Sequence, residues 1–168
     1  ALGVAGLLLA LVGCVLMITH GFIAGLVTLI FAMFLGLCAF SYLYTTLHGK
    51  FVWWGDLLDE AGLKGDEYAV DLGCGRGAVM ISLAKRLTTG RVSGIDLWCR
   101  RDQSGNDIEA TKHNARVCGV EDRVELNIGN ITTLPYHDGQ FDLVVSSLAI
   151  HNLKAREDRR QAIAEAVR

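Results

Sequence analysis

Two kinds of hydrophobic pattern divide this chain of 168 residues. In its first 49 residues there is no Asp, Glu, Lys or Arg, and the apolar runs 1–18 and 22–44 are separated only by Thr19-His20-Gly21. From residue 68 onward, short apolar runs alternate with amphipathic stretches, a pattern typical of strands alternating with helices. The chain therefore joins an uncharged leader to a normally charged globular part.

The leader is too long for one membrane-spanning helix. A helix over residues 1–44 would measure about 66 Å at about 1.5 Å per residue, whereas the hydrocarbon core of a bilayer is about 30 Å thick. We therefore expect a transmembrane hairpin over residues 1–46 with its turn at His20-Gly21. The spacings Gly21-x-x-x-Gly25 and Ala32-x-x-x-Gly36 would let two helices approach closely.

Two other interpretations of the leader fit the sequence less well. A signal peptide has a basic start and an apolar core of about 7–15 residues, and neither is present. A buried hairpin in a soluble protein would normally show a polar face. Lys50 is the first cation, on the C-terminal side of the leader, which favours two spans with the C-terminal domain in the cytoplasm.

Residues 47–67 are expected to form an amphipathic linker helix. Its apolar residues recur at intervals of three and four positions, and Gly62 is a suitable stop; these residues are Trp53, Trp54, Leu57, Leu58 and Ala61. Two roles for the tryptophans remain open. They pack the helix onto the domain that follows, or they also lie in the bilayer surface or at a substrate entrance, as Tyr42 and Tyr44 would lie in the bilayer interface.

The globular part, residues 68–168, alternates strands and helices. Strands are predicted over 68–72, 91–96, 124–127 and 141–146, and helices over 78–87, 107–118 and 154–168. This order predicts an α/β fold: a Rossmann-like, doubly wound, mainly parallel sheet. Strand 141–146 is apolar enough to be buried on both faces, yet the chain ends one helix later. We therefore expect a truncated domain, with about three more strands following in the full reading frame.

The glycine loop after the first strand carries the candidate chemistry. Gly73, Gly75 and Gly77 alternate with other residues and lead directly into a helix, so a ligand can approach backbone N–H groups. Asp96 ends the second strand, where its carboxylate could accept hydrogen bonds from both hydroxyls of a ribose. Asp71 precedes the loop, where it would repel a pyrophosphate and suit a cationic ligand. The tighter G-x-G-x-G spacing and Asp71 favour S-adenosylmethionine over NAD.

These residues carry a resemblance to a known family. Val70-Asp71-Leu72-Gly73-Cys74-Gly75-Arg76-Gly77 resembles the first motif of class I S-adenosylmethionine-dependent methyltransferases, and Gly94-Ile95-Asp96-Leu97 resembles the second. Gly129-Asn130-Ile131, Leu134-Pro135 and residues 141–151 resemble later motifs of the small-molecule branch, which includes quinone, lipid and sterol enzymes. The resemblance covers residues 50–168 and indicates the cofactor rather than the acceptor.

The resemblance implies roles for single residues. The loop would lie along the methionine part of the cofactor, with Asp71 near its amino group, and Asp96 would bind the ribose. Leu97 or Trp98 would pack on the adenine, and Asn130 and Ile131 would meet its edge, although the family commonly has Asp at position 130. Ser146 and Ser147, at the end of strand four, would face the reacting methyl. The implied cofactor-binding residues are Asp71, Gly73, Cys74, Gly75, Gly77, Asp96, Leu97, Trp98, Asn130, Ile131 and Ser146.

His151 is the candidate catalytic residue. It follows the fourth strand, where it could act as a general base or position the substrate, or could merely cap the next helix. No metal-ligand spacing is present, and the five cysteines are expected to be free thiols in a reducing compartment. A net charge of −2 without a basic block gives no indication of nucleic-acid binding.

The sequence thus predicts methyl transfer from S-adenosylmethionine to a small acceptor by in-line displacement. Because a membrane hairpin would hold the domain at a bilayer, the acceptor is expected to be lipophilic or membrane-associated. Two alternatives remain open at this point: a membrane-associated NAD(P)-binding oxidoreductase, and a non-catalytic membrane module that binds the cofactor. The oligomeric state is not predicted.

Overall fold

The computed structural model describes residues 2–99 and 105–168, which form two compact units, residues 1–52 and 53–168. The first unit contains α1 (Leu2–Thr19) and α2 (Phe22–Tyr44), joined by a two-residue turn. The π-helical segment η1 (Thr45–Gly49) follows, and α3 (Lys50–Glu60) comes next. Gly21 has a φ of 95° in the turn, a left-handed conformation that glycine adopts at little cost. The predicted hairpin of two helices is present.

Small residues bring α1 and α2 together at particular points. A Cβ added to Gly25 would lie 1.7 Å from the Cγ of Met17, so no larger residue fits there. Ala32 is also buried, whereas a Cβ on Gly21 or Gly36 would meet nothing within 4 Å. Close packing of α1 against α2 thus uses Gly25 of the predicted pair Gly21/Gly25 and Ala32 of the predicted pair Ala32/Gly36.

The length of the apolar helices bears on the membrane prediction. Among the described residues, one helix, Phe22–Glu60, is long and apolar enough to cross a membrane by length and composition. The apolar helix over Gly3–Thr19 is shorter. The prediction of two spans is therefore supported for one helix only.

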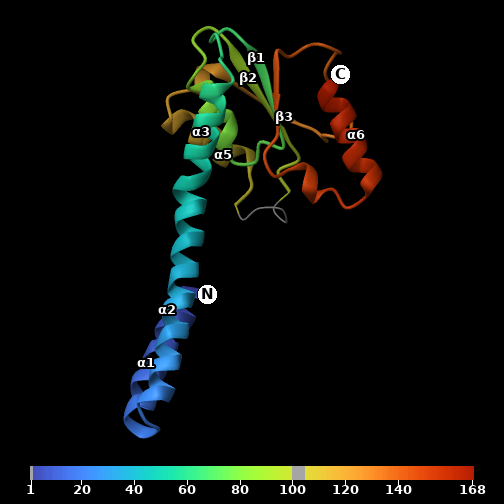
Figure 1. Cartoon of the computed structure of the whole chain (residues 1–168). Coiled ribbons are helices and arrows are strands. Elements are labelled where there is room, and N and C mark those ends of the chain that lie inside the picture. Colours follow the sequence, from blue (N-terminus) through green and yellow to red (C-terminus); the bar gives the residue numbers. More distant parts are fainter. Residues whose placement is uncertain (1, 100–104) are drawn as a thin grey trace. The chain divides into compact units, whose positions relative to one another are not determined.

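The second unit is built on a parallel sheet of four strands in the order β3-β2-β1-β4 (Figure 1). The strands are β1 (Tyr68–Leu72), β2 (Arg91–Asp96), β3 (Val124–Ile128) and β4 (Leu143–Val145). In the register of the sheet, Asp71 of β1 is paired with Val145 of β4, and Asp96 of β2 is paired with Ile128 of β3. The predicted α/β fold is confirmed. The strand order reverses between β1 and β4, which is where ligands bind in such sheets.

Helices cover both faces of the sheet. One face packs against α4 (Ala78–Ala84), α5 (Ile108–Val117) and residues of α3, and its core includes Ala69, Met80, Leu83 and Val92. The opposite face carries α6 (Arg156–Val167), drawn in red in Figure 1, and its core includes Val70, Leu72, Ile95 and Ala162. Alternate residues of β1 and β2 therefore enter two separate cores, as the two-residue period of a strand requires.

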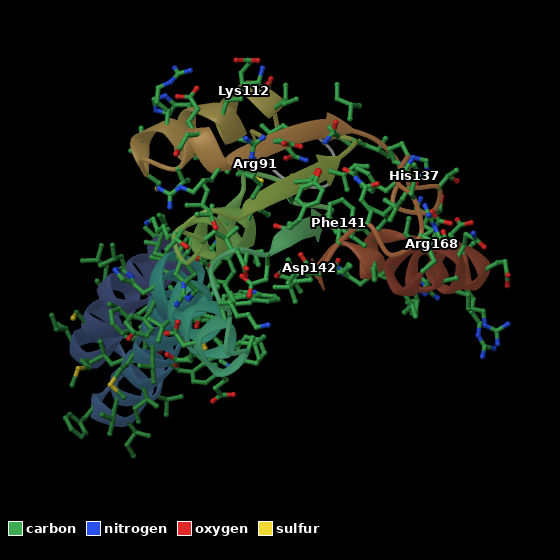
Figure 2. The ribbon with its side chains drawn as sticks, turned by 90° about the horizontal axis from the view of Figure 1, so that it is seen from above. Arg91, Lys112, His137, Phe141, Asp142 and Arg168 are labelled. Carbon is green, nitrogen blue, oxygen red and sulfur yellow. The ribbon has the colours of Figure 1, made fainter. Side chains whose placement is uncertain are left out.

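The fourth strand differs from its prediction. β4 has three residues rather than six, and Val144 is 36% exposed, so burial on both faces is wrong for the described chain. The reason is its position: among the described residues β4 pairs with β1 alone and forms an edge. Asp142, labelled in Figure 2, holds the start of this edge, because its Oδ2 accepts a hydrogen bond from Tyr68 N at 2.8 Å.

Arg168 fastens the loop that precedes β4 (Figure 2). Its guanidinium donates to the backbone carbonyls of Leu134 and Tyr136 at 2.9 and 2.6 Å. It also pairs with the carboxylates of Asp138 and Glu165 at 2.9 and 3.0 Å. These bonds hold the loop against the α6 face of the sheet, where Tyr136 and Phe141 complete the second core.

The C-terminal part of α3 packs onto the domain. Leu58 is only 3% exposed and belongs to the first core, and Trp54 packs against the same cluster. Arg86 strengthens the contact by donating to the Gly55 carbonyl at 2.9 Å and pairing with Asp59 at 2.6 Å. Trp53 is 65% exposed. The two tryptophans therefore differ: Trp54 packs on the domain and Trp53 does not.

Asp71 is a buried carboxyl group inside the first core. It is 1% exposed, its Oδ2 accepts a hydrogen bond from Met80 N at 3.0 Å, and its Oδ1 has no partner among the described residues. Met80 N belongs to the first turn of α4, so the carboxyl caps that helix. Burial raises the pKa of Asp71 to about 7; the Met80 bond lowers it and the charge of Asp96 raises it.

Replacing Leu58 by Ala should destabilise the protein by about 2–5 kcal/mol, because the change leaves a cavity in the first core. Leu57 is the matched control: it lies on the same helix, is 40% exposed, and its replacement by Ala should cost less than about 1 kcal/mol. Thermal unfolding of the full chain in detergent, for the wild type and both variants, measures the difference. Equal shifts in melting temperature would contradict the packing of α3.

Replacing Asp71 by Asn should change how stability depends on pH. Between pH about 4 and about 7 the folded wild type keeps a proton that the unfolded chain releases, so its free energy of unfolding falls as pH rises. Asn has no proton to lose, and the stability of Asp71→Asn relative to wild type should therefore increase across that window and level off above it. Melting temperatures at several pH values test this, with Asp56→Asn, an exposed carboxyl on α3, as the control. Parallel curves for wild type and Asp71→Asn would exclude the raised pKa.

Candidate functional site

The glycine loop Gly73–Gly77 turns between β1 and α4 with three left-handed residues. Gly73, Gly75 and Gly77 have φ values of 74°, 51° and 84°. Gly73 N donates to the carbonyl oxygen of Ile95 at 2.8 Å, which fixes the loop to the end of β2. The prediction of a tight turn built from glycines is therefore confirmed by the backbone geometry.

Asp96 connects the end of β2 to the loop through both of its carboxylate oxygens. Oδ2 accepts from Gly75 N at 2.8 Å and Oδ1 accepts from Trp98 N at 2.6 Å. The side chain is only half-buried. Because each carboxylate oxygen can accept two hydrogen bonds, both oxygens retain acceptor capacity for a ligand with two adjacent hydroxyls.

Thr111 is a site residue that sequence reasoning missed. Its buried hydroxyl lies 2.7 Å from the carbonyl oxygen of Gly75 and accepts from Trp98 Nε1 at 3.0 Å. The carbonyl of Gly75 also accepts from Trp98 Nε1, at 3.1 Å. The spacing Ile108, Thr111, Ala115 on one face of α5 is the signal that could have identified this hydroxyl as inward-facing.

Trp98 and Ile131 are more buried than the other residues predicted to contact the adenine. Trp98 is 9% exposed and Ile131 is 8% exposed, and both belong to hydrophobic cores. Their predicted contacts with the adenine stay predictions. Leu97 is 59% exposed and remains suitable, and Asn130 is exposed, with its Oδ1 accepting from Thr132 N at 3.0 Å.

The end of β4 is tied to two other elements. Ser146 Oγ donates to the carbonyl oxygen of Leu72 at 2.9 Å, at the end of β1. Trp54 Nε1 donates to Ser147 Oγ at 3.1 Å, so α3 also reaches this end of the sheet. His151 lies in the 3-10 turn η3 (Ile150–Asn152) and is exposed. The structure thus brings Ser146 and Ser147 to the carboxyl ends of the strands, as predicted, and adds Trp54.

Cys74 lies in the loop but is not suited to nucleophilic chemistry. It is 7% exposed, and burial, followed by the charges of Asp71 and Asp96, raises the pKa of its thiol well above the ordinary value. Its side chain fills space against the first core. Among the described residues no group of three or more His, Cys, Asp or Glu side chains could hold a metal ion.

The loop, Asp96 and the β4 end form the candidate ligand site of the described residues. Gly73, Gly75, Gly77, Asp96, Leu97 and Ser146 gather at the carboxyl ends of β1, β2 and β4. Asp71 lies beneath this group, buried against α4. Such an arrangement can bind a nucleoside and place a reactive group near the strand-order reversal.

Comparisons with known proteins agree with this geometry. Residues 69–168 match the model of a methyltransferase domain family. The chain is 31% identical over 100 residues to ajmaline N-methyltransferase of Rauvolfia serpentina, covering 59% of this chain and 31% of that protein. It is 32% identical over 117 residues to demethylmenaquinone methyltransferase of Lactiplantibacillus plantarum, covering 69% of this chain and 46% of that protein.

A solved structure gives the same fold. An S-adenosyl-L-methionine-dependent methyltransferase from Methanococcus maripaludis aligns with a TM-score of 0.58 at 20% identity, covering 79% of this chain and 58% of that one. The chain spans less than half the length of the two curated relatives above. The comparisons do not support an oxidoreductase. The family match, the parallel sheet and the glycine loop joined to Asp96 together establish that the chain belongs to the class I S-adenosylmethionine-dependent methyltransferases.

Proposed function

We propose that this protein transfers the methyl group of S-adenosylmethionine to a small, lipophilic acceptor. The observation that carries the proposal is the bond from Gly75 N to Asp96 Oδ2, 2.8 Å long. It holds a carboxylate with free acceptor capacity beside a glycine loop, at the point where the strand order reverses. That combination suits a nucleoside whose reactive end extends toward β4.

The residues of the site fit this cofactor. Asp96 would accept hydrogen bonds from the two ribose hydroxyls, and the exposed Leu97 would pack on the adenine beside Asn130. The Oδ1 of Asp71, which has no hydrogen-bond partner within residues 2–99 and 105–168, lies below the loop, where a cationic ligand would favour the ionised carboxylate. The methionine part of the cofactor would follow the backbone of Gly73, Gly75 and Gly77.

Methyl transfer mainly requires that the protein align the acceptor with the methyl group of the cofactor. The bound cofactor supplies a methyl group on a sulfonium, which is already an activated leaving group. Ser146, fixed to the carbonyl of Leu72, would border the reacting position, and Trp54 would help to exclude water there. A base is needed only for an acceptor that must lose a proton, and the exposed His151 is our candidate for that role.

A lipophilic acceptor is supported by one relative and by the leader. The relative from Lactiplantibacillus plantarum is named for a quinone, and the helical hairpin α1–α2 of this chain lies within residues 1–49, which contain no Asp, Glu, Lys or Arg. We propose that residues 1–46 anchor the protein in a membrane by two spans and that residues 47–67 link them to a cytoplasmic domain, residues 68–168. Gly3–Thr19, at 17 residues, corresponds to the lower end of the lengths that cross a bilayer.

Asp96→Ala should weaken binding of S-adenosylhomocysteine by about 1.5–3 kcal/mol, or about 10- to 150-fold, because hydrogen bonds to a charged group are lost. Calorimetry on the full chain measures the affinity, with Asp122→Ala, an exposed carboxylate before β3, as the matched control. An Asp96→Ala affinity equal to that of wild type would exclude the ribose role.

The same variants test catalysis. Wild type and Asp122→Ala should transfer a labelled methyl group from S-adenosylmethionine into a membrane lipid extract, and Asp96→Ala should transfer it much more slowly at limiting cofactor. Cofactor binding without any transfer would favour a non-catalytic module. Tight binding of NADH without binding of S-adenosylhomocysteine would reject the methyltransferase proposal.

The orientation of the domain can be read from Cys118, an exposed thiol at the end of α5. If the domain is cytoplasmic, a membrane-impermeant maleimide should label Cys118 only after the cells are permeabilised, and the protein should stay with the membrane at alkaline pH. Cys118→Ser is the control for labelling at this position. Labelling of intact cells would place the domain outside, and release at alkaline pH would exclude a spanning anchor.

A further inference from the structure

Leu148 combines two features that are unfavourable for a leucine. Its φ is 55°, in the left-handed region where a side chain with a Cβ is strained, and it is 81% exposed. A glycine or asparagine would adopt this backbone at less cost, and exposure of a large apolar side chain contributes no burial. Strained residues of this kind cluster at ligand sites.

The residues around Leu148 hold it in this conformation. Ser146 Oγ is bonded to the Leu72 carbonyl at 2.9 Å, and Ser147 Oγ accepts from Trp54 Nε1 at 3.1 Å. On the other side, the Cβ of Ala149 lies 2.2 Å from the place where a Cβ on Gly73 would be, so Ala149 packs directly on the glycine loop. Neighbouring contacts therefore fix the backbone on both sides of Leu148.

The strand order places Leu148 on a different side of the sheet's carboxyl end from the other exposed apolar residues there. Leu97 and Ile128, 59% and 71% exposed, follow or end β2 and β3, whereas Leu148 follows β4, beyond β1. An adenine packed on Leu97 would lie on the β2 side of the loop. Leu148 therefore lies on the side left for the second reactant.

The segment around Leu148 is uncharged. Ser146-Ser147-Leu148-Ala149-Ile150 contains no acid or base, and both serine hydroxyls already make hydrogen bonds within the domain. A charged acceptor would find no counter-charge in this segment. Contact with an apolar ring or chain is the recognition that these side chains offer.

We propose that Leu148 is an acceptor-binding residue that contacts the apolar part of a lipid-soluble acceptor. Trp54 positions Leu148 through its hydrogen bond to the neighbouring Ser147. This inference rests on the proposed function and specifies the residue that selects the acceptor. The strained backbone presents the leucine next to Ala149, which packs on the glycine loop, where the methyl group would be transferred.

Three variants of the full chain test this proposal. Leu148→Asn tolerates the left-handed backbone but removes the apolar contact, and Leu148→Met keeps an apolar side chain of similar size. Val117→Asn, at an exposed apolar position of α5 that is 70% exposed, is the matched control. Methyl transfer is measured against a dilution series of a membrane lipid extract, with a water-soluble metabolite fraction as the second acceptor pool.

Leu148→Asn should raise the amount of lipid extract needed for half-maximal transfer by about 10-fold or more, the effect of a lost apolar contact on discrimination. Its affinity for S-adenosylhomocysteine should equal that of wild type, and its melting temperature should not fall. Leu148→Met and Val117→Asn should behave as wild type. Trp54→Phe, which removes the donor to Ser147, should shift half-maximal transfer in the same direction while binding of S-adenosylhomocysteine is kept.

Two results would overturn the inference while leaving the proposed methyl transfer from S-adenosylmethionine intact, and the second would also reject the lipophilic acceptor. One is an unchanged half-maximal concentration for Leu148→Asn, and the other is wild-type transfer to the water-soluble pool alone. Failure of the wild type to bind S-adenosylhomocysteine, or binding without transfer to either pool, would instead reject the proposed function, and the inference with it.

Discussion

The hydrogen bond between Gly75 N and the Asp96 carboxylate is the constraint on which the site depends. It joins the loop after β1 to the end of β2, and Gly73 N bonded to Ile95 O adds a second link. Thr111 and Trp98 hold the opposite side of the loop by contacting the Gly75 carbonyl. Because both backbone groups of Gly75 are hydrogen-bonded within the domain, the loop is held in a shape that favours a preorganised ligand surface.

Two carboxyl groups near this loop have different environments and therefore different tasks. Asp96 is half-buried and bonded to two backbone N–H groups, so it is suited to accept hydrogen bonds from a ligand. Asp71 is buried, one of its oxygens has no partner in the described part of the chain, and burial raises its pKa to about 7. It caps α4 through Met80. The charge of one carboxyl opposes ionisation of the other, and a cationic ligand at the loop would relieve that opposition.

Much of the fold followed from local patterns. Strands 68–72 and 91–96 have the predicted bounds because each is a continuous, mostly buried run, and because Gly73 follows the first and Gly90 precedes the second. Strand four was misjudged because apolar residues predict burial but not pairing: with β1 as its only partner among the described residues, β4 is a short edge strand and Val144 is exposed. In the leader, composition predicted two helices, but close packing at Gly25 rather than Gly21 depends on how the helices face each other.

The sequence by itself determined the cofactor class, because the features that indicate it can be read locally. Asp71 and the glycines lie close together in the chain, and Asp96 lies at the end of the neighbouring strand. It could not decide between Leu97 and Trp98 at the adenine, since both are apolar; the tertiary structure buries Trp98 and leaves Leu97 exposed. Nor could it pair Trp54 with Ser147, which are 93 positions apart. That contact arises only when α3 packs against the sheet, because residues far apart in the chain meet through folding rather than through spacing.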